Sequence, residues 1–214
     1  MTTTDDLQAL IELAASLRPR RTAAKPLPRL LFVTDPQRTP DPEAIVRRLP
    51  AAVGVIYRSF GAPDAGPRAE RLREITGERG MLLLVGDDNG LAQTCRADGT
   101  HLPERRIAQA PALRSVRPDW LITAAAHSLE AAERAAACGC DAVLVSPVFA
   151  SNSPSAGAPM GAAAFAGLVA AAPLPVYALG GVNLRTAREL RDSGAAGLAM
   201  VEEMARLATP RSEP

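Results

Sequence analysis

The sequence predicts an α/β protein whose parallel strands close into a (β/α)8 barrel, a TIM barrel, with an extra helix at the N-terminus. Short apolar runs alternate with helical segments eight times, the pattern of a parallel sheet with helical crossovers. The runs are apolar throughout, as strands buried on both faces require. Residues 134–145 resemble residues 190–201, and residues 91–102 are a fainter copy. This repetition favours a closed barrel built from one recurring unit.

An open, doubly wound sheet is the alternative architecture. Such a sheet usually has a glycine-rich first crossover, whereas the first predicted strand ends in Thr34-Asp35-Pro36 with no glycine nearby. We therefore expect the closed barrel.

The first 28 residues stand apart from the rest of the chain. Apolar side chains from Leu7 to Ala14 form a helical stripe within residues 5–17, and Pro19, Pro26 and Pro28 then indicate a linker. We expect this helix to pack on the outside or at one end of a single barrel domain over residues 29–208, with a tail at 209–214.

The expected strands and helices follow one another in a regular order. The strands are expected at 30–34, 53–57, 81–85, 99–102, 121–126, 142–148, 175–179 and 196–201. The helices are expected at 42–49, 67–78, 88–96, 106–115, 128–138, 160–171, 183–193 and 202–208.

The composition excludes several classes of function. A net charge of +1 and an aromatic content of 3% argue against binding of nucleic acid. No apolar run approaches the roughly 18 residues of a membrane span, and no basic segment marks a secretory signal. We read Cys95, Cys138 and Cys140 as reduced thiols of a cytoplasmic protein. The only lysine, Lys25, precedes the first predicted strand, which argues against Schiff-base chemistry at a strand end.

One strand end has the composition of an anion site. Leu174 to Gly181 reads LPVYALGG, and Asn183 then begins a predicted helix as its N-cap. Backbone N–H groups of a glycine pair near a helix start bind anions, phosphate above all. An ordinary strand-to-helix turn has the same composition, so both interpretations stay open.

Polar residues at the other predicted strand ends are the further candidates, because a (β/α)8 barrel carries its site there. The loop over residues 149–159 is the longest and is rich in Ser, Pro and Gly, so it is long enough to close over a ligand. The candidates are Thr34, Asp35, Arg58, Ser59, Asp87, Asp88, His101, Glu104, His127, Ser128, Ser146, Ser151 to Ser153, Gly180, Gly181, Glu202 and Glu203.

Five motifs, in order along the chain, resemble those of the thiamine phosphate synthase/TenI family. They read LFVTD (31–35), GDD followed by ADGTHL (86–102), AHSLEAA (126–132), DAVLVSPVF (141–149) and ALGGV (178–182). The resemblance covers about residues 29–207. It implies a (β/α)8 barrel that joins pyrimidine and thiazole phosphate, or that tautomerises the thiazole.

The resemblance assigns roles to several residues. It implies that Arg58 contacts a diphosphate and that Asp87 and Asp88 are ligands of Mg²⁺ if synthase activity is retained. In the long loop, Ser151 and Ser153 retain the hydroxyl groups of the two threonines in the family's Thr-x-Thr-Lys motif. The backbone of Gly180, Gly181 and Val201 is the phosphate-binding candidate.

The chain departs from the synthase pattern at five positions. A family lysine is replaced by Phe60, a carboxylate by Arg106, a serine by Ala125, a loop lysine by Pro154 and a phosphate-binding serine by Glu202. Synthase chemistry holds Mg²⁺ by carboxylates and stabilises a departing diphosphate with cations. Each lost donor at such a site costs about 3–4 kcal/mol of transition-state stabilisation. We therefore expect a divergent family member.

Two histidines lie in the matching motifs. The resemblance implies that His127 transfers a proton in a thiazole tautomerase, because imidazole exchanges protons near neutral pH without a metal. The alternative for His127 is a structural hydrogen bond to the helix start at Ser128. His101 is a substrate-binding candidate or, alternatively, a structural residue beside Asp98.

Glu202 is difficult to reconcile with a phosphate ligand, because a carboxylate beside the glycine pair repels an anion. Either its side chain points away into the helix that starts there, which is favourable at a helix N-terminus, or the ligand is not a phosphate.

Three functions remain open at this stage. The first is an enzyme of thiamine biosynthesis or salvage that binds a phosphorylated thiazole or thiamine phosphate, with His127 as the catalytic residue of a tautomerase. The second is an Mg²⁺-dependent thiamine phosphate synthase. The third is a non-catalytic binding or regulatory barrel.

Overall fold

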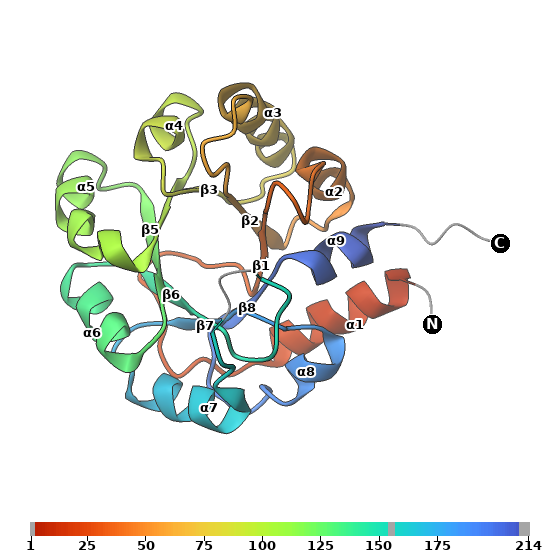
Figure 1. Cartoon of the computed structure of the whole chain (residues 1–214), viewed down its shortest axis with the longest axis vertical. Coiled ribbons are helices and arrows are strands. Elements are labelled where there is room, and N and C mark those ends of the chain that lie inside the picture. Colours follow the sequence, from red (N-terminus) through yellow and green to blue (C-terminus); the bar gives the residue numbers. More distant parts are fainter. Residues whose placement is uncertain (1–2, 154–156, 210–214) are drawn as a thin grey trace.

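The computed structural model describes residues 3–153 and 157–209, and over these residues it is a closed barrel of eight parallel strands (Figure 1). Each strand pairs with its neighbours in chain order, and β1 closes the ring by pairing with β8. The (β/α)8 prediction is therefore confirmed. The strands are β1 (Leu30–Val33), β2 (Val53–Tyr57), β3 (Leu83–Gly86), β4 (Gly99–Leu102), β5 (Leu121–Ala126), β6 (Ala142–Val145), β7 (Val176–Ala178) and β8 (Gly197–Met200).

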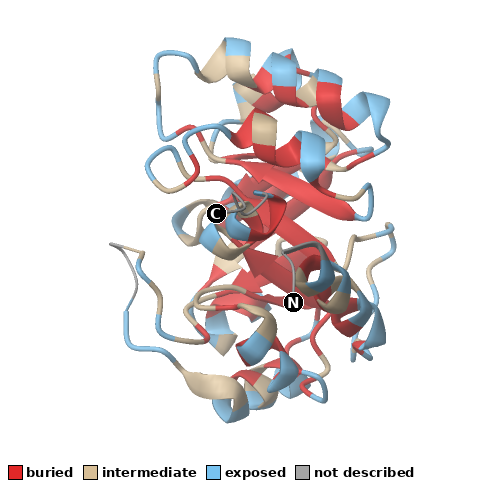
Figure 2. Ribbon diagram, turned by 90° about the vertical axis from the view of Figure 1, so that its right-hand side faces the viewer, coloured by how far each residue is buried: buried red, intermediate tan, exposed pale blue. Residues whose placement is uncertain are grey.

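Helices surround the ring of strands, with α2 to α8 forming most of the outer layer (Figure 1). Figure 2 shows buried strands at the centre and helices that expose one face to solvent. The helices are α1 (Thr3–Ser16), α2 (Pro42–Arg48), α3 (Ala65–Glu78), α4 (Asn89–Thr94), the 3₁₀ helix η1 (Glu104–Gln109), α5 (Ala110–Val116), α6 (Leu129–Ala137), α7 (Gly161–Ala171), α8 (Leu184–Arg188) and α9 (Glu202–Ala208).

The continuously apolar strands supply two cores, as both-face burial requires. Leu31 and Val33 of β1 pack inside the barrel, whereas Leu30 and Phe32 pack against the helices. Tyr177 belongs to the inner core, and its hydroxyl donates to the Pro28 carbonyl at 2.6 Å. Successive side chains of each strand point to opposite faces of the sheet. One set therefore fills the barrel interior, and the other packs against the helices.

Most elements lie within two residues of their expected bounds, and three differ most from the sequence expectation. Strand β6 ends at Val145 rather than at residue 148, since Pro147 has no N–H with which to continue the ladder. Helix α8 ends at Arg188 rather than at 193, and turns follow it. The helix expected at 106–115 consists of η1 followed by α5, which has Pro111 in its first turn.

The N-terminal helix α1 packs outside the barrel against α8 and α9, as expected (Figure 1). The linker after α1 runs under the end where the strands begin, where Lys25 Nζ donates to the Pro118 carbonyl at 2.9 Å. Whether residues 1–28 are a separate unit stays a prediction. Of the expected tail, residues 210–214 lie outside the described residues.

The sequence repeat serves a structural purpose at the end where the strands begin. Asp98 and Asp141 occupy equivalent positions in residues 91–102 and 134–145. The Asp98 carboxylate accepts from Leu83 N at 2.8 Å and from Arg73 at 2.9 Å. The Asp141 carboxylate accepts from Ile122 N at 2.7 Å and from Arg114 at 2.6 Å. Each aspartate therefore ties the start of one strand to the preceding one.

Within the described residues, the helices are too short or too polar to cross a membrane.

Candidate functional site

The carboxyl ends of the eight strands meet at one end of the barrel, which we call the mouth. The residue that follows each strand leaves the sheet at this end, so side chains from distant parts of the chain gather there. The residues that follow the strands at the mouth include Thr34, Arg58, Asp87, Pro103, His127, Ser146, Leu179 and Val201.

Arg58, directly after β2, is held in one position by the end of β1. Its Nε donates to the Thr34 carbonyl at 2.8 Å, its backbone N–H donates to Thr34 Oγ1 at 2.9 Å, and its Nη2 lies 3.5 Å from Asp35 Oδ2. Burial lowers the pKa of Arg58 to about 10, and Asp35 opposes this shift. The guanidinium is therefore a fixed cation at neutral pH.

Asp35 is shared between two arginines. Burial alone raises the pKa of this carboxyl, but hydrogen bonds from the Arg38 side chain at 2.9 Å and from the Arg38 and Gln37 backbone lower it below its usual range. Arg38 Nε is buried and has no hydrogen-bond partner among the described residues. Arg38 was not a sequence candidate, although its place three residues after Asp35 in the same loop was a usable signal.

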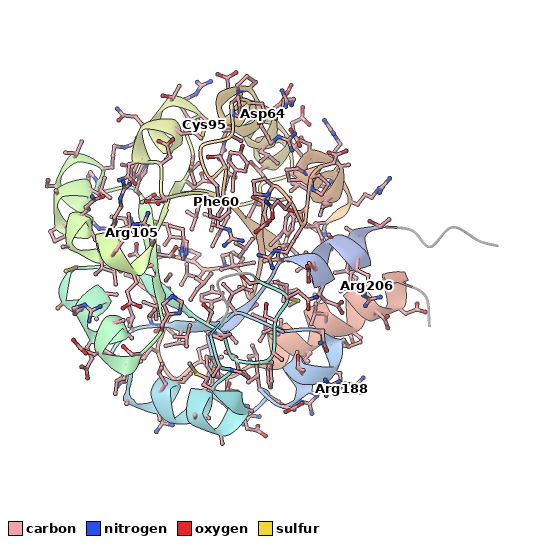
Figure 3. The ribbon with its side chains drawn as sticks, viewed as in Figure 1. Phe60, Asp64, Cys95, Arg105, Arg188 and Arg206 are labelled. Atoms are coloured by element: carbon pink, nitrogen blue, oxygen red, sulfur yellow. The ribbon has the colours of Figure 1, made fainter. Side chains whose placement is uncertain are left out.

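Phe60 lies where the family pattern has a lysine, and its ring is exposed to 71%. The Arg58 guanidinium carbon lies 5.1 Å from the ring centroid, a cation–π contact. Phe60 has a positive φ of 49°, which is uncommon for a bulky residue. Figure 3 shows Phe60 inside the ring of helices near β2 and β3. An exposed aromatic ring thus lies beside the Arg58 guanidinium.

Asp87, directly after β3, is neutralised by two arginines of η1. Arg105 Nη2 donates to Asp87 Oδ2, and Arg106 Nη1 donates to the Asp87 backbone carbonyl at 3.0 Å. Oδ1 is buried and lies 2.8 Å from Arg106 Nη1 as an ion pair, although the two atoms are not aligned as a hydrogen bond. Both carboxylate oxygens of Asp87 therefore lie against guanidinium groups.

The side chains near Asp87 do not fit Mg²⁺. Asp88 is the N-cap of α4 and accepts from Leu91 N at 2.8 Å. The next amide oxygen, Asn89 Oδ1, accepts from Thr100 Oγ1 at 2.8 Å. In the described part of the chain, His, Cys, Asp and Glu side chains form no group of three that could hold a metal. Mg²⁺ is held in proteins through one or two carboxylates that are free to bind it, and the Asp87 carboxylate is paired with two arginines instead.

His127 follows β5 and is exposed, with one ring nitrogen fixed. Nδ1 lies 2.6 Å from the Ser146 carbonyl, which only accepts, so Nδ1 carries the proton. Ser128 caps α6 by accepting from Ala131 N at 3.1 Å, and the partner of the His127 ring is the Ser146 carbonyl. In the neutral ring the lone pair is therefore on Nε2. The choice between a structural and a catalytic His127 stays a prediction.

Glu104 holds the backbone at His127. Its Oε2 accepts from His127 N at 3.0 Å, and its Oε1 accepts from Arg134 Nη2 at 3.0 Å. The ring of His127 and its backbone are thus held by different partners, from β6 and from η1. Such support orients an imidazole toward one direction.

His101 lies within β4 and is only 7% exposed. Its Nδ1 is 2.9 Å from Thr123 Oγ1, so its neighbour is Thr123 and not Asp98, whose carboxylate lies at the opposite end of the strand. Burial lowers the pKa of His101 to about 3, and the charge of Arg58 acts in the same direction. His101 is therefore a neutral ring at physiological pH.

The glycine pair after β7 packs against the loop that follows β6. Gly180 and Gly181 have positive φ angles of 91° and 63°. A Cβ on Gly181 would lie 2.2 Å from the Ala150 carbonyl oxygen, and Phe149 N donates to the Gly180 carbonyl at 3.0 Å. Loop packing is thus a sufficient reason for both glycines. The N-cap expected at Asn183 is confirmed, since its side chain accepts from Arg185 N and Thr186 N.

Glu202, the first residue of α9, does not point away from the loop. Its Oε2 lies 3.4 Å from Asn152 Nδ2, a residue of the loop that follows β6. In the same loop Ser153 N donates to Ser151 Oγ at 3.3 Å, whereas Pro154 lies outside the described residues. A carboxylate therefore stands between this loop and α9, beside Val201.

Cavity size does not locate the site. The larger groove, about 390 Å³, lies on the outside between α1 and α8 and is lined by Ala9, Glu12, Leu13, Ser16, Leu184, Arg188, Arg191 and Asp192. A smaller cavity of about 170 Å³ lies beside Arg58, at the ends of β1 and β2. We assign the site to the mouth, because the paired and oriented polar groups gather there.

The structure brings sequence candidates together in three groups. Thr34 and Asp35 contact Arg58, Glu104 and Ser146 contact His127, and Glu202 contacts Asn152 of the loop over residues 149–159. Asp87 instead meets two arginines of η1. Arg105 was not a candidate, and Arg106 was noted only as a reversal of charge. Their signal was the run Glu104-Arg105-Arg106 directly after the fourth predicted strand.

Comparisons with known proteins agree with the fold and the motifs. The family model described as thiamine monophosphate synthase (TMP-TENI) matches residues 30–204. A solved thiamine phosphate pyrophosphorylase from Pyrococcus furiosus is 26% identical with a TM-score of 0.73, over 85% of this chain and 92% of that chain.

Two relatives are similar in sequence. A thiamine-phosphate synthase of Methanoculleus marisnigri is 40% identical over 62% of this chain and 64% of its own length. A thiamine-phosphate synthase of Anaeromyxobacter dehalogenans is 36% identical over 80% of this chain and 79% of its own length.

Proposed function

Because the chain belongs to the thiamine monophosphate synthase family, we propose that it is an enzyme of thiamine biosynthesis that binds a phosphorylated thiazole at the mouth and transfers a proton with His127. The observation that carries this proposal is the hydrogen bond of His127 Nδ1 to the Ser146 carbonyl. It leaves Nε2 as the basic nitrogen of a ring whose backbone is held by Glu104.

The proposed chemistry is proton transfer without a metal. Nε2 of His127 takes a proton from one position of the thiazole, and the resulting imidazolium returns a proton to another. The ring gains and loses one proton, so no oxidant or reductant takes part. The Ser146 carbonyl accepts the Nδ1–H bond in both states of the ring and stabilises the imidazolium.

Two places at the mouth are candidates for the phosphate of such a ligand. One is the glycine turn, with backbone N–H groups of Gly181 and Val201 and the hydroxyl groups of Ser151 and Ser153, but the Glu202 carboxylate stands beside it. The other is the arginine side of the mouth, where Arg58 and the η1 arginines lie. Both remain proposals.

The test is turnover of thiazole phosphate isomers by the purified chain, followed by NMR. We expect His127→Asn to lower the rate by about 10²- to 10⁴-fold, the usual contribution of a general base. Glu133→Gln, an exposed change on α6, is the control and should leave the rate unchanged. No isomer turnover by the unaltered chain, or full activity of His127→Asn, would overturn the proposal.

Synthase activity is the second candidate, and the names of the relatives favour it. Arg58 is the cation that this chain keeps from the family's diphosphate motif. The synthase proposal requires thiamine phosphate to form from the pyrimidine diphosphate and thiazole phosphate. Formation that depends on Mg²⁺ would support it, and binding of thiazole phosphate with neither reaction would instead support a non-catalytic barrel.

A further inference from the structure

We propose that Asp87, Arg105 and Arg106 form an anion-binding cluster that works without a metal, in which the arginines bind an oxyanion and the aspartate positions them. The inference rests on the proposed function, and it adds where the anionic group of the ligand binds. The ligand class is a phosphate ester or another small oxyanion.

The cluster is held by contacts between Asp87 and the two guanidinium groups. Arg106 Nη1 bonds the Asp87 carbonyl at 3.0 Å and lies 2.8 Å from Asp87 Oδ1, while Arg105 donates to Oδ2. Asp87 has a positive φ of 59°, a conformation that aspartate tolerates better than most residues. One residue at the end of β3 therefore positions two consecutive arginines of η1.

The charge of the cluster is positive. Two guanidinium groups against one carboxylate leave one net positive charge. The two neighbouring carboxylates have other partners: Asp88 caps α4, and Glu104 accepts from His127 N and Arg134. The cluster alone thus carries one net positive charge, whereas Asp88 keeps its negative charge because its partner is a neutral backbone N–H.

The arginines have donors to spare. A guanidinium carries five N–H groups in a planar fork that matches phosphate. In the described part of the chain Asp87 is the partner of both arginines, and their side chains are exposed to 68% for Arg105 and 42% for Arg106. Donors that point toward solvent at the mouth are available to an arriving anion.

The same reasoning disfavours Mg²⁺ at Asp87. A metal would have to displace two arginines from the carboxylate, and it would then lie beside two positive charges. The glycine turn is also disfavoured for an anion, because the exposed Glu202 carboxylate lies 3.4 Å from Asn152 of the loop that packs on this turn. Charge therefore favours an oxyanion rather than a metal at the arginines.

The experiment is calorimetric titration of the full chain with inorganic phosphate, in low salt, once with EDTA and once with Mg²⁺. We expect binding of equal affinity in both conditions. Arg106→Gln should weaken it by about tenfold, the loss of one charge-assisted hydrogen bond. Arg188→Gln makes the same change of charge on the outside of α8, far from Arg105 (Figure 3), and should leave the affinity unchanged.

Asp87→Asn separates the two roles of the aspartate. An asparagine keeps an oxygen for Arg106 and removes a negative charge, so phosphate affinity should stay equal or rise. Phosphate binding that requires Mg²⁺ would assign Asp87 to a metal, and phosphate binding that is lost in Asp87→Asn would show that the arginines do not hold the anion themselves; either result would overturn the inference.

Three further results would also contradict the cluster. They are no phosphate binding in EDTA, an unchanged affinity in Arg106→Gln, and an equal loss in Arg188→Gln, which would indicate unspecific attraction. Far-ultraviolet circular dichroism checks whether each variant is folded. If Arg106→Gln does not fold, Arg105→Gln serves as the second test. Phosphate binding that persists while thiazole turnover is absent would overturn the proposed function and leave the cluster standing.

Discussion

Aspartate–arginine pairs occur at both ends of this barrel, and they differ in what surrounds them. At the end where the strands begin, Asp141 bonds Arg114 and also the buried backbone N–H of Ile122. At the mouth, Asp87 bonds Arg105 and Arg106, whose side chains are far more exposed. The first pair supplies the acceptor for a backbone N–H of the sheet, whereas the second leaves guanidinium N–H donors exposed to solvent. The same residue types therefore stabilise the fold at one end and are available for a ligand at the other.

The largest expected effect on stability is at the end where the strands begin. Asp141→Ala removes the partner of Arg114 and leaves the N–H of Ile122, a fully buried residue, without an acceptor. We expect the free energy of unfolding to fall by about 3 kcal/mol. Urea denaturation measures it, with the exposed Asp119→Ala as a control that should change little. An effect no larger than that of the control would remove the distinction between the two ends.

An intermediate effect is expected from His101, which lies inside the barrel between the two ends. Its pKa is about 3 in the folded chain, against about 6.5 for an unfolded histidine. The folded pKa is depressed, so stability is complete above pH 6.5 and is lost as the pH falls toward 3. The expected loss steepens from about 0.7 kcal/mol per pH unit at pH 6.5 to about 1.4 kcal/mol per pH unit near pH 5, as the unfolded histidine becomes fully protonated.

Denaturation at a series of pH values measures this loss. His101→Gln keeps a polar group beside Thr123 and removes the titration, so its stability should depend less on pH over the same range. An identical slope in the variant would mean that His101 is accessible to protons in the folded barrel, and would move it from the core to the ligand-binding part of the mouth.

The smallest expected effect is at the mouth itself. The Asp87 side chain is 39% exposed and its partners are more so, and exposed ion pairs contribute about 0–1 kcal/mol. Asp87→Asn should therefore lower the free energy of unfolding by less than about 1 kcal/mol in the same urea experiment. A loss as large as that of Asp141→Ala would show that Asp87 is a structural residue like its counterpart.

The mouth could be recognised in advance because strand ends are visible in the sequence. Apolar runs end where polar residues begin, and this places Arg58, Asp87 and His127 at one end of any parallel barrel. Their partners were not visible. Arg105 lies 18 residues from Asp87 in the chain, and Ser146 lies 19 residues from His127. A pattern of burial says which end a residue faces, and not which side chain it meets.

The glycine pair illustrates the same limit from the other direction. A strand followed by Gly180 and Gly181 indicated an anion site, and the composition is equally that of a turn. The structure supplies a packing reason, the close approach of the Ala150 carbonyl, and places the Glu202 carboxylate near Asn152, 50 residues away in the chain. The backbone conformation of the glycine pair depends on residues close by in the sequence. The position of the Glu202 carboxylate depends on a residue far away in the chain.

The sequence by itself determined the closed barrel, the order of its elements and the helix cap at Asn183. These features depend on local periodicity and on side chains that bond their own backbone within three residues. Only the tertiary structure decided the proton position on His127, the arginine partners of Asp87 and the burial of His101. Each of these depends on distances between side chains from different strands, which exist only once the barrel has closed.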